Sequence, residues 1–106
     1  MSYSAASFVE ALSDVRLDNV FNPYSDLCEL HDEPDAAARR RRNLELSLAA
    51  AIELEVSTVW IARDLGYRGG RRTGLALTDE AHLDAYSALF HGLPVQKATK
   101  GPIMGE

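Results

Sequence analysis

The sequence predicts an α/β fold in which a parallel sheet is covered by helices on both faces. A long apolar helix, expected to end near Leu54, leads directly into residues 56–62, a run rich in β-branched and aromatic side chains. A helix that feeds a short apolar strand is half of a crossover unit, and such strands lie inside parallel sheets. Residues 94–99 offer only a weak second strand, so we expect the sheet to be incomplete in this chain.

The first helix is expected over residues 4–15, followed by a loop over residues 17–24. Ser4 can cap the helix, and three apolar residues spaced by four and three give it one apolar stripe. These residues are Phe8, Leu12 and Val15. The Asn-Pro pair in the loop is a turn signal, and Phe21 and Tyr24 are expected to anchor the loop in the core.

The second helix is expected to begin near residues 32–35, where carboxylates favour the positive end of the helix dipole. Its last three turns are apolar over most of their circumference, so we expect them to be deeply buried. The residues concerned are Leu44, Leu46, Leu48, Ala50, Ile52 and Leu54. Residues 39–42 are four arginines that point all round the helix, and this end is expected to stay in contact with water.

A glycine- and arginine-rich loop is expected over residues 63–78, followed by a third helix over residues 79–90 with Thr78 as its cap. Residues 91–106 contain glycines and prolines and are expected to form an irregular tail. No internal repeat divides the chain, so residues 1–106 are expected to belong to a single domain.

The composition, 46% hydrophobic and 25% charged over 106 residues, excludes wholesale disorder. The longest apolar stretch, residues 48–52, is far shorter than the roughly 20 residues that a membrane span needs. Charged residues near the N-terminus interrupt any apolar region of a secretory signal. The single cysteine, Cys28, excludes an internal disulfide and fits a reducing compartment. We therefore expect a cytoplasmic protein that does not associate with a membrane.

The loop over residues 63–78 is the candidate functional segment. The net charge of −5 argues against a general polyanion binder, but four arginines gather in this loop with a single acid, Asp64. Glycines let backbone N–H groups approach a ligand closely, and arginines offer forked donors that suit phosphate oxygens. The alternative is a solvated, flexible loop, and the spacing alone leaves both interpretations open.

The residues from Ala62 to Glu80 resemble the first motif of the uracil-DNA glycosylase superfamily, in which a strand ends in a loop followed by glycines and a Thr-Gly pair. The run Gly69-Gly70-Arg71-Arg72-Thr73-Gly74 carries the resemblance, and residues 19–24 (Asn-Val-Phe-Asn-Pro-Tyr) are similar to a segment of bacterial members. The resemblance implies the N-terminal part of a three-layer α/β/α sandwich and hydrolysis of the bond joining uracil, or a related deaminated base, to deoxyribose in DNA.

The resemblance also implies roles for individual residues. Asp64 falls on the position that orients water or stabilises the sugar cation, which suits a carboxylate. The expected contacts to the extruded base come from Arg63, Leu65, Gly66 and Tyr67. The expected contacts to DNA phosphates come from Arg68, Gly69, Gly70, Arg71, Arg72 and Thr73. An Asp64 that merely pairs with a neighbouring arginine is the structural alternative.

The chain departs from the family pattern at several positions. Ala62 replaces a glycine, Leu65 replaces a proline, and Gly66 stands where the uracil-only branch has a thymine-excluding tyrosine. The family's second motif, a His-Pro segment, has no match, so excision is expected to be weak or absent if the chain ends at Glu106. The alternatives are a non-catalytic DNA- or phosphate-binding module, an incomplete inactive fragment and a self-associating structural domain.

Cys28 and His31 have the spacing of half a zinc site. The other histidines, His82 and His91, lie far along the chain and do not provide a second pair. We therefore expect a structural or surface role for Cys28 and His31, and neither a metal nor another cofactor.

Overall fold

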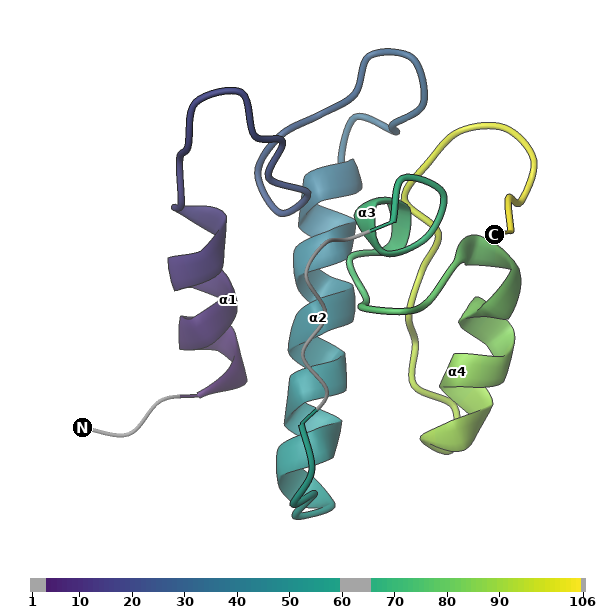
Figure 1. Ribbon diagram of the computed structural model, residues 1–106. Helices are drawn as coiled ribbons and strands as arrows, with labels where there is room; N and C mark the ends of the chain where they lie inside the picture. Colours follow the sequence, from purple (N-terminus) through teal and green to yellow (C-terminus); the bar gives the residue numbers. More distant parts are fainter. Residues whose placement is uncertain (1–3, 60–65, 106) are drawn as a thin grey trace.

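The computed structural model describes residues 4–59 and 66–105, and within them the chain is mostly helical (Figure 1). The elements, in chain order, are α1 (Ala5–Ser13), α2 (Ala36–Glu53), the single turn α3 (Gly70–Thr73), the 3₁₀ turn η1 (Glu80–His82) and α4 (Leu83–Leu89). α2 is central, with α1 on one side and α3 and α4 on the other. None of these helices combines the length and the apolar character that crossing a bilayer requires.

The predicted α/β class, with its parallel sheet and three-layer α/β/α sandwich, is wrong for the described residues. Their one β pairing is an isolated antiparallel bridge between Asp32 and Thr99. Residues 56–59 of the predicted strand are exposed and irregular, and residues 60–62 lie outside the described part of the chain. A strand needs neighbours to satisfy its backbone N–H and C=O groups, so β propensity alone does not produce a sheet. Of residues 94–99, the predicted weak second strand, only Thr99 forms a bridge, and its partner is Asp32.

The three predicted helices are confirmed with small changes at their ends. The Ser4 side chain accepts a hydrogen bond from the Ser7 amide while the Ser7 hydroxyl oxygen accepts one from the Ser4 amide, a capping box that starts α1. The third predicted helix corresponds to η1 and α4. Its cap is Asp79 rather than Thr78, because the Asp79 carboxylate accepts from the His82 amide at 2.9 Å.

The burial of α2 is the reverse of the prediction. Its buried residues, Ala36, Ala37, Arg40 and Asn43, all lie in the half that carries the arginine run. In contrast, Ile52 is 62% exposed and Leu54 is 59% exposed at the apolar end. The loops around residues 23–32, 72–75 and 96–99 gather against the first half of α2, and their backbone carbonyls need donors, which arginine and asparagine supply.

The C-terminal tail has no helix or strand in residues 93–98, as predicted, yet part of it belongs to the core. Ala98 is fully buried and Thr99 nearly so. The amide of Gln96 donates to the Asn43 side chain at 2.8 Å, and the Asn43 amide group donates back to the Gln96 carbonyl at 2.8 Å. This reciprocal pair attaches the tail to α2 and brings it beside the glycine-rich loop.

Candidate nucleic-acid interface

Residues 66–78 of the predicted functional loop are described, and within them residues 66–74 (the glycine loop) form a turn followed by α3. The amides of Gly69 and Arg71 both donate to the carbonyl of Gly66, and Gly69 and Gly70 are buried. Gly74 ends α3 with φ +78°, the left-handed conformation that glycine adopts without steric cost. The glycines therefore allow a tight turn with its backbone close to neighbouring elements.

Three side chains from other segments hold the last carbonyls of α3. Arg40 Nε donates to the carbonyl of Arg72 at 3.0 Å, and Asn43 Nδ2 donates to that of Thr73 at 2.8 Å. The Tyr24 hydroxyl donates to the carbonyl of Gly74 at 2.6 Å. The carbonyls at a helix C-terminus have no partner within the helix, so these donors fix its position against α2.

Arg40 also joins the glycine loop to the segment over residues 19–24, the second stretch that carries the family resemblance. Its remaining nitrogens donate to the Pro23 carbonyl, at 3.3 Å, and to the Asp32 carboxylate. Because Arg40 and Asp32 are both buried, the ion pair is shielded from water. The two stretches, about 50 residues apart in sequence, therefore lie side by side.

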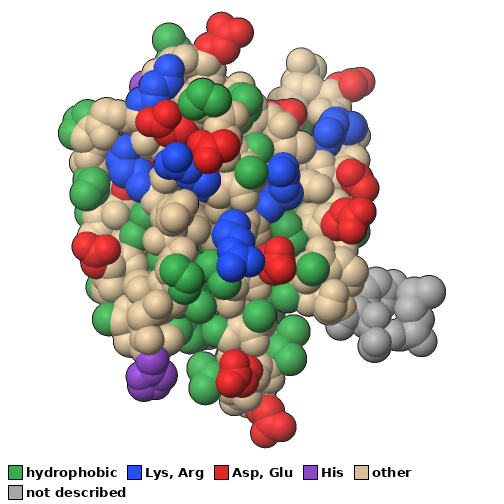
Figure 2. Space-filling view, turned by 180° about the vertical axis from the view of Figure 1, so that it is seen from behind, with side chains coloured by type: hydrophobic (Ala, Val, Ile, Leu, Met, Phe, Trp, Pro, Cys, Tyr) green, Lys and Arg blue, Asp and Glu red, His purple; other side chains and the backbone are tan. Residues whose placement is uncertain are grey.

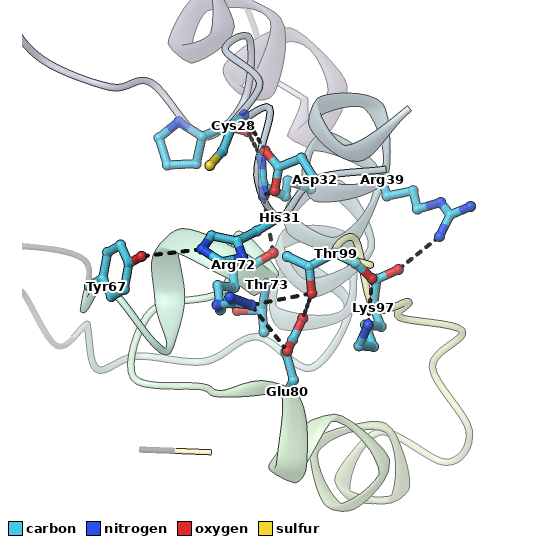
Figure 3. A network of polar contacts seen from close by, with 12 residues as sticks. Cys28, His31, Asp32, Arg39, Tyr67, Arg72, Thr73, Glu80, Lys97 and Thr99 are labelled. Atoms are coloured by element: carbon cyan, nitrogen blue, oxygen red, sulfur yellow. Dashed lines mark hydrogen bonds and ion pairs between the residues drawn. The ribbon is translucent and has the colours of Figure 1, made fainter. Parts of the chain in front are cut away.

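Arg72 and Thr73, two of the expected phosphate-binding residues, are buried and already partnered (Figure 3). Arg72 lies 3.7 Å from the Glu80 carboxylate and donates to the Thr99 hydroxyl at 3.4 Å, and that hydroxyl donates to Glu80. The Thr73 hydroxyl donates to the Thr78 carbonyl at 2.8 Å. Their side chains hold the glycine loop to η1 and the tail in this structure.

Tyr67 and Arg68 are exposed on the glycine loop, and Arg71 is half-buried. The Arg71 guanidinium lies 3.9 Å from the ring centroid of Phe21 and 5.4 Å from that of Tyr67. Stacking uses the face of the guanidinium and leaves its N–H groups at the edge, where a phosphate oxygen can accept them. Within the described residues no acceptor lies within hydrogen-bonding distance of Arg68 or Arg71 side chains, so both cations are available to a ligand.

The other expected site residues fall in two groups. Gly66 and Tyr67 are exposed, and the Tyr67 hydroxyl lies 3.4 Å from His31 Nε2 (Figure 3). Arg63, Asp64 and Leu65, which include the expected catalytic carboxylate, lie outside the described residues. The structure therefore brings together the expected phosphate and base contacts at Tyr67, Arg68 and Arg71.

The residues that position the loop were not singled out by the sequence, except Tyr24, which was expected to be buried. Arg40 stands within four consecutive arginines, and nothing in that run distinguishes it. A usable signal exists nevertheless, because Ala36, Arg40 and Asn43 follow the i, i+4, i+7 spacing of one helix face. A helix face that carries a small alanine followed by an arginine and an asparagine indicates that the helix packs closely against the backbone of loops.

The Cys28–His31 segment is a turn in this structure. The Cys28 amide donates to the Asp32 carboxylate at 2.9 Å, and the Asp32 amide donates to the Cys28 carbonyl at 2.9 Å (Figure 3). Within residues 4–59 and 66–105, no group of three or more His, Cys, Asp or Glu side chains is placed to hold a metal ion. Asp32 is engaged by Arg40 and by this turn.

One face of the molecule carries charges of both signs. Figure 2 shows the face turned away from the view of Figure 1, where Lys and Arg side chains alternate with Asp and Glu. A surface of mixed sign does not attract a polyanion along its whole length. Anion binding is therefore expected to depend on a few placed side chains, such as those of the glycine loop.

The contribution of Tyr24 to the free energy of unfolding is expected to depend on pH. Burial raises the pKa of its phenol from 10.0 to about 12, against a smaller lowering by the positive charge of Arg40. Between pH 10 and 12 the folded protein holds a proton that the unfolded chain has lost, so stability falls as pH rises through this range. Two pKa units correspond to about 3 kcal/mol. Urea denaturation at a series of pH values measures this loss.

Tyr24→Phe is the control for this prediction, because it removes the titrating group and keeps the ring. We expect the variant to lose less stability than the unmodified chain between pH 10 and 12. At neutral pH it is expected to be less stable by about 1–3 kcal/mol, since the Gly74 carbonyl is left without its donor. Equal declines in the two proteins would contradict the assignment to Tyr24.

Comparison of the chain with models of known protein families, with curated proteins and with solved structures finds no match. The resemblance to the uracil-DNA glycosylase superfamily therefore depends on the residues of the glycine loop and of the 19–24 segment. The fold of the described residues adds no support to it, because they contain no parallel sheet.

Proposed function

We propose that the chain binds DNA containing a damaged base and acts as a DNA N-glycosylase of the uracil-DNA glycosylase type. The observation that carries the proposal is the position of Arg71. Its guanidinium stacks on Phe21 of the 19–24 segment, at an exposed surface that also holds Arg68 and Tyr67. The two stretches of the resemblance thus meet at one surface, and its groups suit phosphates and bases.

In this proposal Arg68 and Arg71 hold the phosphodiester and position the strand without reading its sequence. The target base leaves the stack, because its glycosidic bond cannot be reached inside a duplex. The exposed backbone of Gly66 and the ring of Tyr67 then contact the base. The Asp64 carboxylate accepts a proton from the attacking water or stabilises positive charge on the sugar. A cytoplasmic location belongs to the proposal and agrees with the free thiol of Cys28.

Release of uracil from a uracil-containing oligonucleotide tests the proposal. Because the second motif of the family has no match here, we expect the chain to release uracil only slowly. Asp64→Asn is expected to lower that rate by roughly a hundredfold or more, because an amide cannot accept the proton. DNA affinity is expected to change little, since Asp64 does not hold the phosphate. The matched control is Asp84→Asn, at an exposed position of α4, and it is expected to leave the rate unchanged. Undiminished excision by Asp64→Asn would remove Asp64 from the mechanism.

The second candidate is a DNA- or phosphate-binding module without catalysis. It is favoured by three groups of the glycine loop, the exposed Tyr67 and Arg68 and the half-buried Arg71, which are suited to binding rather than to hydrolysis. Salt-dependent DNA binding without base release would support this candidate over the enzyme. The absence of both DNA binding and base release would contradict both.

A further inference from the structure

Phe21, Tyr67 and Arg71 form an aromatic–arginine cluster on the surface. Phe21 comes from the 19–24 segment and the other two residues come from the glycine loop, so the cluster exists only because the fold joins these stretches. Tyr67 is 58% exposed, far more than a ring that contributes to a core. Its hydroxyl is within reach of His31 Nε2, at 3.4 Å, which limits the directions in which the ring can turn.

The surroundings of the cluster include an apolar hollow and a further cation. Beside Phe21 lies a shallow hollow of about 190 Å³ lined mostly by apolar side chains, including those of Leu17 and Val20. Arg68, which follows Tyr67 in the chain, is exposed. An exposed ring with an arginine over it, beside an apolar hollow, offers groups that suit the two chemical parts of a nucleotide, the base and the phosphate.

We propose that this cluster binds an unpaired nucleotide of DNA, with the base stacked on the Tyr67 ring and the phosphate at the edge of Arg71. The inference rests on the proposed DNA binding and specifies its substrate class as single-stranded or locally opened DNA. In a duplex each base face is already covered by its neighbours, so a stacking ring on the surface gains nothing from it. Arg68 and Arg71 can still contact the phosphates of a duplex. Duplex binding therefore reports the phosphate contacts alone, whereas single-strand binding also includes base stacking on Tyr67.

Fluorescence anisotropy with a labelled oligothymidylate and with a duplex of the same length tests this inference on the full chain. We expect the single strand to bind about tenfold more tightly or more. Tyr67→Ala is expected to weaken binding of the single strand at least about fivefold and to leave duplex binding unchanged. Tyr67→Phe retains the ring and is expected to keep most of the affinity for the single strand.

Two controls accompany these variants. Leu77→Ala removes an exposed apolar side chain outside the cluster and is expected to change neither affinity. Arg71→Gln is expected to weaken the binding of both the single strand and the duplex. Arg42→Gln, on the exposed surface of α2, is expected to leave both affinities nearly unchanged.

Equal affinity for the two DNAs, or single-strand binding that Tyr67→Ala leaves unchanged, would overturn the inference while the proposed DNA binding stands. Absence of binding to either DNA would overturn the proposed function itself, and the inference with it. A folded state of each variant, verified by circular dichroism, makes a lost affinity attributable to the cluster.

Discussion

Asp32→Ala is expected to lower the free energy of unfolding by about 3–5 kcal/mol, which is the usual cost of removing one partner of a buried ion pair. The side chains of Asp32 and Arg40 are each only 2% exposed, so the guanidinium would be left without its counterion and largely without water. The Cys28 amide would lose its acceptor as well. Urea denaturation followed by circular dichroism measures the difference.

Asp35→Ala is the matched control, because Asp35 pairs with Arg39 over one turn of α2 on the protein surface. Exposed pairs of this kind contribute about 0–1 kcal/mol, so we expect a loss several times smaller than for Asp32→Ala. Similar losses for the two variants would show that the Asp32–Arg40 pair is not shielded from water. It would then contribute no more than a surface contact to the position of the glycine loop.

The helices were predictable because their signals are local. The capping box at Ser4 and the cap at Asp79 lie within a few residues of the ends that they specify. The sheet was not predictable in the same way, because a strand depends on partners far along the chain. Residues 56–59 have the composition of a strand, but the described structure contains no neighbour that pairs with them.

The candidate site was predictable as a segment but not residue by residue. Arg71 and Arg72 are adjacent and chemically identical, yet Arg71 is half-buried and packs on the ring of Phe21, while Arg72 is buried against Glu80. Consecutive residues of a helical turn point about 100° apart, so which arginine reaches solvent depends on how α3 rotates against α2. That rotation is determined by the donors from Arg40, Asn43 and Tyr24, contacts that composition does not reveal.

Gly74→Ala is expected to destabilise the protein by about 3 kcal/mol for two separate reasons. The backbone of Gly74 has φ +78°, which costs a residue with a Cβ atom about 1–2 kcal/mol. The added Cβ would also lie 2.8 Å from Arg40 Cβ and 3.0 Å from both the Cα and the carbonyl oxygen of Arg40. Relieving such overlap typically costs about 1–3 kcal/mol, because α3 or α2 has to move. Urea denaturation measures the total.

Gly101→Ala separates the two contributions, since Gly101 has nearly the same backbone angle, φ +79°, and no atom within 4 Å of an added Cβ. We expect this control to show the backbone cost alone and therefore to be less destabilised than Gly74→Ala. The difference between the two variants reports how firmly α3 is held against Arg40. Equal losses of stability for the two variants would mean that α3 can move away from α2 at no cost. The position of Arg71 would then not be fixed before DNA binds.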